Sequence, residues 1–369
     1  MEEGFLLEYR IQRFLFHKGY TTRRSLPLKS YFYPDEIDLT DIDVYAIKFD
    51  EDFNETVLIT ECKSGTSKNV KAFDRLLWLR GLMYYLHIPN GMIFIQKKLS
   101  LNAKKFAHDN NIIPINPEWF DKIEKEMNLC GDWRGSYSIH HHTKMIKYYN
   151  DIKKSPDNLS RYYWFLKIKF WLLPPSIQIK EIKRGYEEFS KKCLINKDYE
   201  HWILCESIVL ISIAALKFCK ELYPLVENER KEWIKIKLME GIDFSIEKQE
   251  KTLEYIKMYI EHKIYELTGK KTTISKEEFR IPPPEYTDNL IELMNRLLKN
   301  PKYSTQIPRF LDFITFEYIL NDKNIDRAEL AQLFPEIDLD LLAKMSKNLI
   351  RFLDPQIESR KVMNKLLSF

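Results

Sequence analysis

The chain has 369 residues, more than a single hydrophobic core usually holds, so two domains are expected. Hydrophobic residues make up 44% of it and charged residues 30%, which excludes a disordered chain and predicts a folded, soluble protein. The formal net charge is +4, from 58 Lys and Arg against 54 Asp and Glu. This small surplus permits nucleic-acid binding through a local basic patch but does not require it.

Cysteine usage and hydropathy indicate the compartment. None of the five cysteines belongs to a Cys-x-x-Cys pair, so a reducing environment without disulfide framework or zinc ribbon is expected. The N-terminal sequence MEEGFLLEYR is acidic and lacks the layout of a signal peptide. The most apolar stretch, 202–218, contains Glu206 and is short for a membrane span. It is predicted to be a buried core helix of a cytoplasmic protein with no membrane partner.

The first part of the chain mixes helical and extended patterns. A helix is expected over 3–18, where apolar positions recur at helical spacing and Gly19 follows. The expected strands are 30–33, 42–49, 56–63, 91–96 and 112–115, and the expected helices between them are about 69–87 and 100–110. A helix, three strands and then alternating strands and helices predict an α/β domain over 1–140, with a mixed sheet flanked by helices.

Beyond residue 140 the strand patterns fade and lysine-rich helical patterns follow. The expected helices are 178–195, 199–222, 246–267, 287–299, 306–321 and 338–353. Prolines mark the joints between them, including a triple proline at 282–284. An all-helical C-terminal region over 141–369, subdivided near this triple proline, is therefore predicted.

An apolar strand that ends on two charges occurs within TVLITECKSG at 56–65. Because alternate residues of a strand share a face, Glu61 and Lys63 follow Val57 and Ile59 on one side of it. An acid and a lysine are thus held side by side on rigid backbone. In a chain with 30% charged residues this pair could equally be a simple ion pair at a strand end.

The preceding strand begins with a further acid, Asp43, in DIDVYA. If the two strands form a hairpin, antiparallel pairing places Asp43 beside Glu61 and Lys63. The two carboxylates and the backbone carbonyl of Cys62 would then form an oxygen-rich site suited to Mg²⁺ or Mn²⁺. Such a metal polarises a phosphoryl oxygen and lowers the pKa of bound water, while Lys63 would orient the water and stabilise developing negative charge.

Glu8 is a candidate fourth member of this site. It lies on a helical stripe with Ile11 and Leu15, so it could face the sheet and bind a second metal or support the site from behind. A solvated helix residue is an equally good interpretation of Glu8.

These residues together resemble the PD-(D/E)xK nuclease superfamily. Its Mrr-like and Card1-like branches share an (D/E)IDV…ECK pattern, and the similarity covers about residues 3–120. The resemblance implies a restriction-endonuclease-like core and metal-dependent phosphodiester cleavage. Asp43 matches the first acid of the motif, Glu61 the second acid, Lys63 the lysine and Glu8 the helical acid of many members.

One half of the motif departs from the pattern. Ile42 stands where the motif has proline, and Asp38 and Asp41 are rival choices for the first acid. Asp43 is preferred because it begins the apolar strand.

Several lysines near the predicted motif could contact phosphates, although solvated helix ends would look the same. They are Lys68, Lys71, Lys97, Lys98, Lys104 and Lys105. Other patterns favour ordinary structure. The run His140-His141-His142 is predicted to be a polar interdomain loop, and the aromatic stretch 161–171 a helix that packs one face on the core.

The predicted function is a divalent-metal-dependent endonuclease that cleaves DNA, with a role in prokaryotic antiviral defence or on a mobile element that rests on the resemblance alone. Cutting both strands normally needs two sites, so a homodimer is expected. Two alternatives stay open: an RNase using the same residues, and a non-catalytic nuclease-fold scaffold whose helical region recruits a protein partner.

Overall fold

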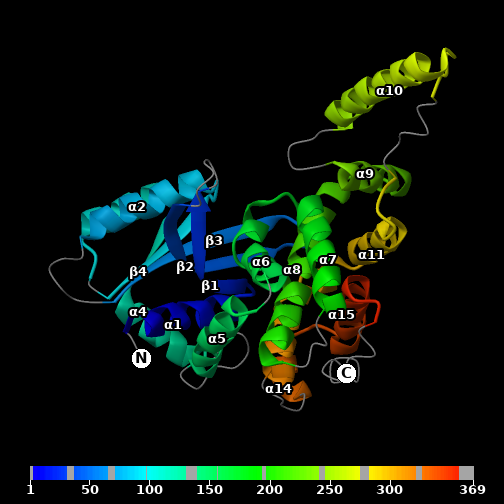
Figure 1. Cartoon of the computed structure of the whole chain (residues 1–369). Coiled ribbons are helices and arrows are strands. Elements are labelled where there is room, and N and C mark those ends of the chain that lie inside the picture. The colour runs from blue at the N-terminus through cyan, green and yellow to red at the C-terminus, as the bar shows by residue number, and fades with distance from the viewer. Residues whose placement is uncertain are drawn as a thin grey trace.

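The computed structural model describes residues 3–30, 37–64, 71–96, 98–129, 139–155, 157–192, 197–240, 246–274, 282–320 and 326–356 (Figure 1). A five-stranded sheet forms the first part of the chain, in the order β1-β2-β3-β4-β5. The strands are β1 Thr21–Ser30, β2 Ile37–Phe49, β3 Glu55–Lys63, β4 Asn90–Ile95 and β5 Ile112–Ile115. The first three are antiparallel neighbours, and β3, β4 and β5 run parallel. The predicted mixed sheet is confirmed.

Helices cover both faces of this sheet (Figure 1). The flanking helices are α1 Glu3–His17, α2 Ala72–Tyr85, α3 Leu101–Asp109 and α4 Pro117–Glu126. Leu58 and Cys62 of β3 pack in a cluster with apolar residues of α1 and α4. Val57 and Ile59 belong to the other cluster, with α2. The predicted alternation along this strand is therefore confirmed.

The rest of the chain is helical. Its elements are α5 Ile139–Lys153, α6 Asp157–Lys167, the 3₁₀ turn η2 Lys169–Leu172, α7 Pro175–Lys192, α8 Asp198–Leu222, α9 Glu227–Met239, α10 Ile246–Thr268, α11 Thr287–Lys299, α12 Pro301–Ser304, α13 Ile307–Ile314, the π-helical η4 Thr315–Leu320, α14 Arg327–Leu333 and α15 Leu339–Leu353. One hydrophobic cluster runs from Ile59 and Leu79 through Ile208 of α8 to Phe310 of α13. The sheet and the helical region thus share a core.

Helix α8 is the centre of that core. It is long and apolar enough to cross a membrane by length and composition, but 94% of its most apolar window is buried inside the structure. The prediction of a buried core helix is confirmed.

Residues 31–33 of the strand expected at 30–33 lie outside the described part of the chain. The structure places strand β1 earlier, at Thr21–Ser30, where no strand was expected from the sequence. The charged residues and Pro27 of β1 give it a sequence that does not look like a strand. Proline is tolerated there because β1 is the edge strand of the sheet and pairs with β2 alone. The histidine run is not a loop but the first turn of α5, which packs through Tyr148 and Ile152, four residues apart, on the core.

The aromatic stretch packs on the core as expected, with Leu166 and Phe170 fully buried, although α6 ends at Lys167. Helices α4, α9 and α14 were not expected from the sequence.

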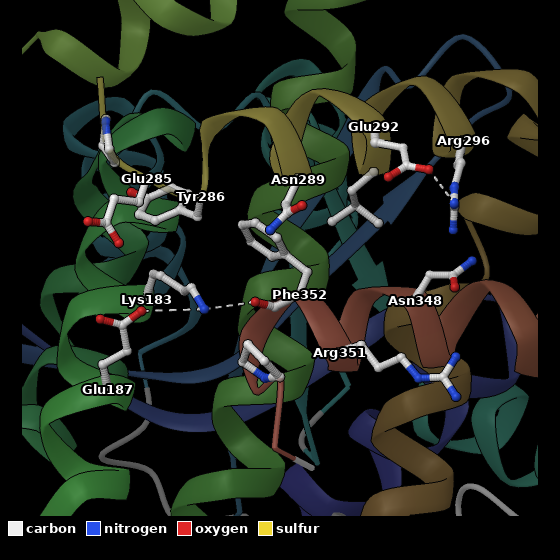
Figure 2. Close-up of a pocket in the computed structure, with 13 residues that line it drawn as sticks. Lys183, Glu187, Glu285, Tyr286, Asn289, Glu292, Arg296, Asn348, Arg351 and Phe352 are labelled. Carbon is white, nitrogen blue, oxygen red and sulfur yellow. Dashed lines mark hydrogen bonds and ion pairs between the residues drawn. The ribbon is translucent and has the colours of Figure 1, made fainter. Parts of the chain in front are cut away.

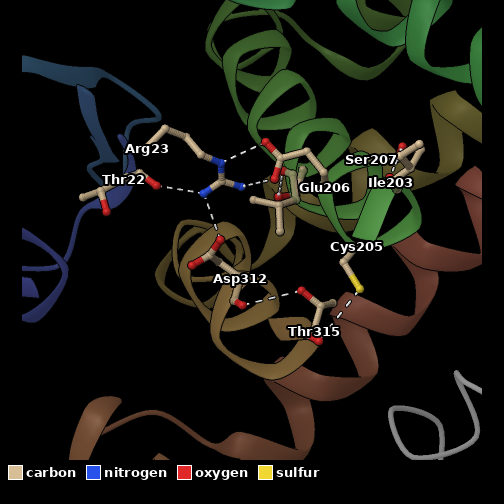
Figure 3. Close-up of polar contacts among 10 residues, drawn as sticks. Thr22, Arg23, Ile203, Cys205, Glu206, Ser207, Asp312 and Thr315 are labelled. Atoms are coloured by element: carbon tan, nitrogen blue, oxygen red, sulfur yellow. Dashed lines mark hydrogen bonds and ion pairs between the residues drawn. The ribbon is translucent and has the colours of Figure 1, made fainter. Parts of the chain in front are cut away.

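A buried ion network joins β1 to the helical region (Figure 3). The guanidinium of Arg23 donates two hydrogen bonds to Glu206 of α8, at 3.0 and 2.9 Å, and one to Asp312 of α13 at 2.9 Å. Arg309 of α13 donates to the carbonyl of Phe16 at the end of α1, at 3.0 Å. The helical region therefore holds both β1 and the end of α1 in place through buried hydrogen bonds.

Candidate active site

The site lies where β2 and β3 separate. Their ladder runs as far as the pair Val44–Thr60, and continuing its register places Asp43 opposite Glu61. Beyond that pair the Asp43 carboxylate replaces a ladder bond, because its Oδ2 accepts the backbone N–H of Cys62 at 2.7 Å. The hairpin prediction for Asp43 therefore agrees with the observed register.

Lys63 bridges the two acids. Its Nζ lies 3.1 Å from Glu61 Oε1 and 3.6 Å from Asp43 Oδ2. Glu61 is buried, with a side chain only 2% exposed, whereas Lys63 is 32% exposed and so reaches solvent. Buried Glu61 Oε1 accepts no well-directed hydrogen bond from the described residues, and the guanidinium of Arg75 in α2 approaches it at 3.6 Å.

Glu8 reaches this cluster from α1. Burial and the nearby charge of Asp43 raise the pKa of Glu8 from 4.5 to about 7, while Arg24 and Lys63 act in the opposite direction. The hydroxyl of Ser25 lies 3.5 Å from Glu8 Oε2. Glu8 thus lies among the charged residues of the site, as its interpretation as a fourth site member requires.

Ser25 marks a distortion of the sheet at this point. Its φ is +48°, in the left-handed region that a serine seldom adopts. The pairs Arg24–Val44 and Leu26–Ile42 enclose it, so it lies opposite Asp43 in the register of β1 and β2. Left-handed residues outside glycine often occur at functional sites, where the surrounding structure holds them in place.

The pKa values of all three acids in the site are raised above their ordinary values. Burial raises the pKa values of Asp43 and Glu61 as well as that of Glu8, and repulsion from Asp43 adds to the rise for Glu61. The neighbouring acids raise the pKa of the Lys63 ammonium against the opposing effect of burial. Burial therefore disfavours the ionised form of all three acids, so an added cation would stabilise the ionised acids.

The donor set suits a hard divalent cation. In a strand, the N–H and C=O of one residue point the same way across the sheet, so the Cys62 carbonyl faces the gap where Asp43 takes its N–H. Among the residues that the structure describes, no three His, Cys, Asp or Glu side chains could hold a metal by themselves. Mg²⁺ in proteins usually keeps several waters and needs only one or two carboxylates. Asp43, Glu61 and the Cys62 carbonyl therefore fit Mg²⁺ or Mn²⁺.

The rival acids lie less favourably. Asp41 is exposed and contributes only repulsion that raises the pKa of Asp43. The side chain of Asp38 lies outside the described residues.

The predicted phosphate-binding lysines are placed in part. Lys68 and Lys97 lie outside the described residues. Lys71 precedes α2 and Lys98 follows β4, both exposed, and the backbone N–H of Gln96 donates to the Lys63 carbonyl at 3.2 Å. Lys98 is therefore at the sheet end that carries Lys63.

Lys104 and Lys105 are on α3, whose Phe106 ring packs 5.8 Å from that of Phe73 at the start of α2. They thus lie beside the helix that provides Arg75.

Sequence reasoning missed Arg75, Arg24 and Ser25. Arg75 lies in the first turns of α2, the helix that follows the Glu61–Lys63 strand. This position was the only sequence feature that could have pointed to it. Comparison with known protein families, curated proteins and solved structures finds no match for this chain.

Proposed function

We propose that the protein is a divalent-metal-dependent endonuclease that hydrolyses phosphodiester bonds in DNA. The observation that carries the proposal is the contact of Lys63 with both Asp43 and Glu61 at the point where β2 and β3 separate. Two acids and a lysine on adjacent rigid strands supply the groups that phosphodiester hydrolysis needs, which are chiefly positioning and charge stabilisation.

Asp43, Glu61 and the Cys62 carbonyl would hold Mg²⁺ or Mn²⁺. When bound, the ion supplies Lewis-acid polarisation of the phosphate and a more acidic water. Its positive charge would also favour the ionised form of the two acids, whose pKa values are raised chiefly by burial.

The protein's own groups account for the remaining steps. Lys63, partly exposed at the mouth of the site, would orient the attacking water and stabilise negative charge as it develops at phosphorus. Arg75, held against Glu61, would add positive charge from α2. Glu8, with a pKa of about 7, can hold or release a proton near neutral pH beside Asp43.

The exposed lysines at the same sheet end, Lys71 and Lys98, would contact the backbone of the nucleic acid. Cleavage of both DNA strands would need a homodimer that provides two such sites.

A Lys63→Met variant tests the assignment of roles. It is expected to bind Mn²⁺ at least as well as the wild type, because the competing ammonium is gone, and to lose cleavage by at least about 100-fold. Cleavage at the wild-type rate would remove Lys63 from the mechanism. Loss of Mn²⁺ binding would show that Lys63 supports the site only structurally.

A further inference from the structure

A cavity of about 810 Å³ lies away from the candidate active site, between α7, α11 and α15 (Figure 2). Two of its cations are already engaged inside the protein: the Lys183 ammonium donates to the carbonyls of Phe352 and Leu353 at 2.9 and 3.1 Å, and Arg296 pairs with Glu292.

The second cavity, of about 550 Å³, lies between the sheet, the connection from α2 to β4, and the helices α6 and α8. We name it the sheet–helix cavity. Its volume is that of a small-molecule site. Its walls include two large aromatic side chains in contact, Tyr45 of β2 and Trp171 of η2, with ring centroids 4.8 Å apart. Such walls favour a planar ring.

The charged lining of the sheet–helix cavity is mainly cationic. Among the residues that the structure describes, Lys167, Lys217 and Lys220 line it together with a single acid, Glu55, which already lies 3.3 Å from Lys217. Lys167 is half-buried, and its close acid, Glu206, is engaged by Arg23. An anionic group entering the cavity would therefore meet an excess of positive charge.

We propose that the sheet–helix cavity binds a small ligand of the nucleotide class, with its base against the Tyr45–Trp171 wall and its phosphate at the three lysines. The aromatic pair accounts for the planar part of this ligand, and the lysine excess accounts for its charge.

The cavity also adjoins the candidate active site through the backbone. Leu26 and Ile42, which line it, are paired across β1 and β2. In sequence, Leu26 directly follows Ser25 and Ile42 directly precedes Asp43. A bound ligand would bear on the strand pair that holds Asp43 in place, so occupancy is expected to change nuclease activity. This regulatory consequence rests on the proposed nuclease function, whereas binding itself does not.

Calorimetric titration of the full-length protein tests the proposal. The probes are adenosine 5′-monophosphate and cytidine 5′-monophosphate, with adenosine and inorganic phosphate as the separated halves of the ligand. One equivalent of a monophosphate is expected to bind at least about tenfold more tightly than either half. Inorganic phosphate binding as tightly as both nucleotides would overturn the proposal, and so would no binding by any probe.

Variants locate the site. Lys220→Ala, at an exposed position, and Lys167→Met are each expected to weaken nucleotide binding about tenfold, whereas Lys191→Ala on the outer surface of α7 is expected to leave it unchanged. Asp43→Asn should also leave binding unchanged. Binding that survives both cavity variants but disappears in Asp43→Asn would place the nucleotide at the catalytic acids and overturn the proposal. Nucleotide binding without any nuclease activity would support the cavity and contradict only the nuclease function.

Discussion

Replacing Glu8 by glutamine is expected to stabilise the folded protein at alkaline pH. The pKa of Glu8 is raised from 4.5 to about 7, so the folded state binds this proton more tightly than the unfolded state. Below pH 4.5 both states are protonated and the carboxyl resembles an amide. Between the two pKa values, stability falls as pH rises, and above pH 7 the loss is complete. At about 1.4 kcal/mol per pH unit, the ionised Glu8 costs up to about 3 kcal/mol.

Urea unfolding at pH 5, 6, 7 and 8 without divalent metal measures this effect. Glu8→Gln should exceed the wild type by no more than about 1 kcal/mol at pH 5 and by about 3 kcal/mol at pH 8. Glu188→Gln, at an exposed position of α7, is the matched control and should show no such trend. A constant difference between Glu8→Gln and the wild type at all four pH values would refute the reasoning.

Four further substitutions follow from the packing and the charges. Lys63→Met should destabilise the metal-free protein by about 1 to 3 kcal/mol at pH 8. The loss should be smaller at pH 5, because the acidic partners of Lys63 are then closer to neutral. Equal losses at both pH values in urea unfolding would contradict this. Arg23→Met leaves two buried carboxylates without their guanidinium and should cost about 3 to 5 kcal/mol, whereas a loss below about 1 kcal/mol would mean that the network is solvated. Gly185→Ala would place a Cβ against the ring of Tyr162 with too little room, so it should lower the melting temperature. Gly81→Ala in α2, where a Cβ would meet nothing within 4 Å, should raise it.

The part of the site that the sequence predicts is the part encoded by local pattern. The two-residue period of β3 determines that Glu61 and Lys63 share a face, and the short turn between β2 and β3 determines the register that brings Asp43 opposite Glu61. The sequence separation between Asp43 and Glu61 is small, so few alternative pairings compete. For the same reason, most helix positions were predicted within a few residues.

The rest depends on tertiary contacts that leave no local signal. Ser25 has a left-handed backbone, but serine does not predict that conformation as glycine or asparagine would. In its network, Arg23 contacts Glu206, which is 183 positions away in the chain, and Asp312, which is 289 positions away. The contact of Arg75 with Glu61 depends on how α2 crosses the sheet. Strand β1 was not predicted because its pattern is that of an exposed segment, and its pairing with β2 makes it a strand.

The most direct test of the central claim is cleavage of plasmid DNA and of a structured RNA by the purified protein, alongside Glu61→Gln. Each reaction is run with Mg²⁺, with Mn²⁺ and with EDTA, and Mn²⁺ binding is measured on the same preparations. We expect metal-dependent DNA cleavage by the wild type and its loss, by at least about 100-fold, in Glu61→Gln. A wild-type protein that neither binds Mn²⁺ nor cleaves, or a variant that cleaves as well as the wild type, would contradict it.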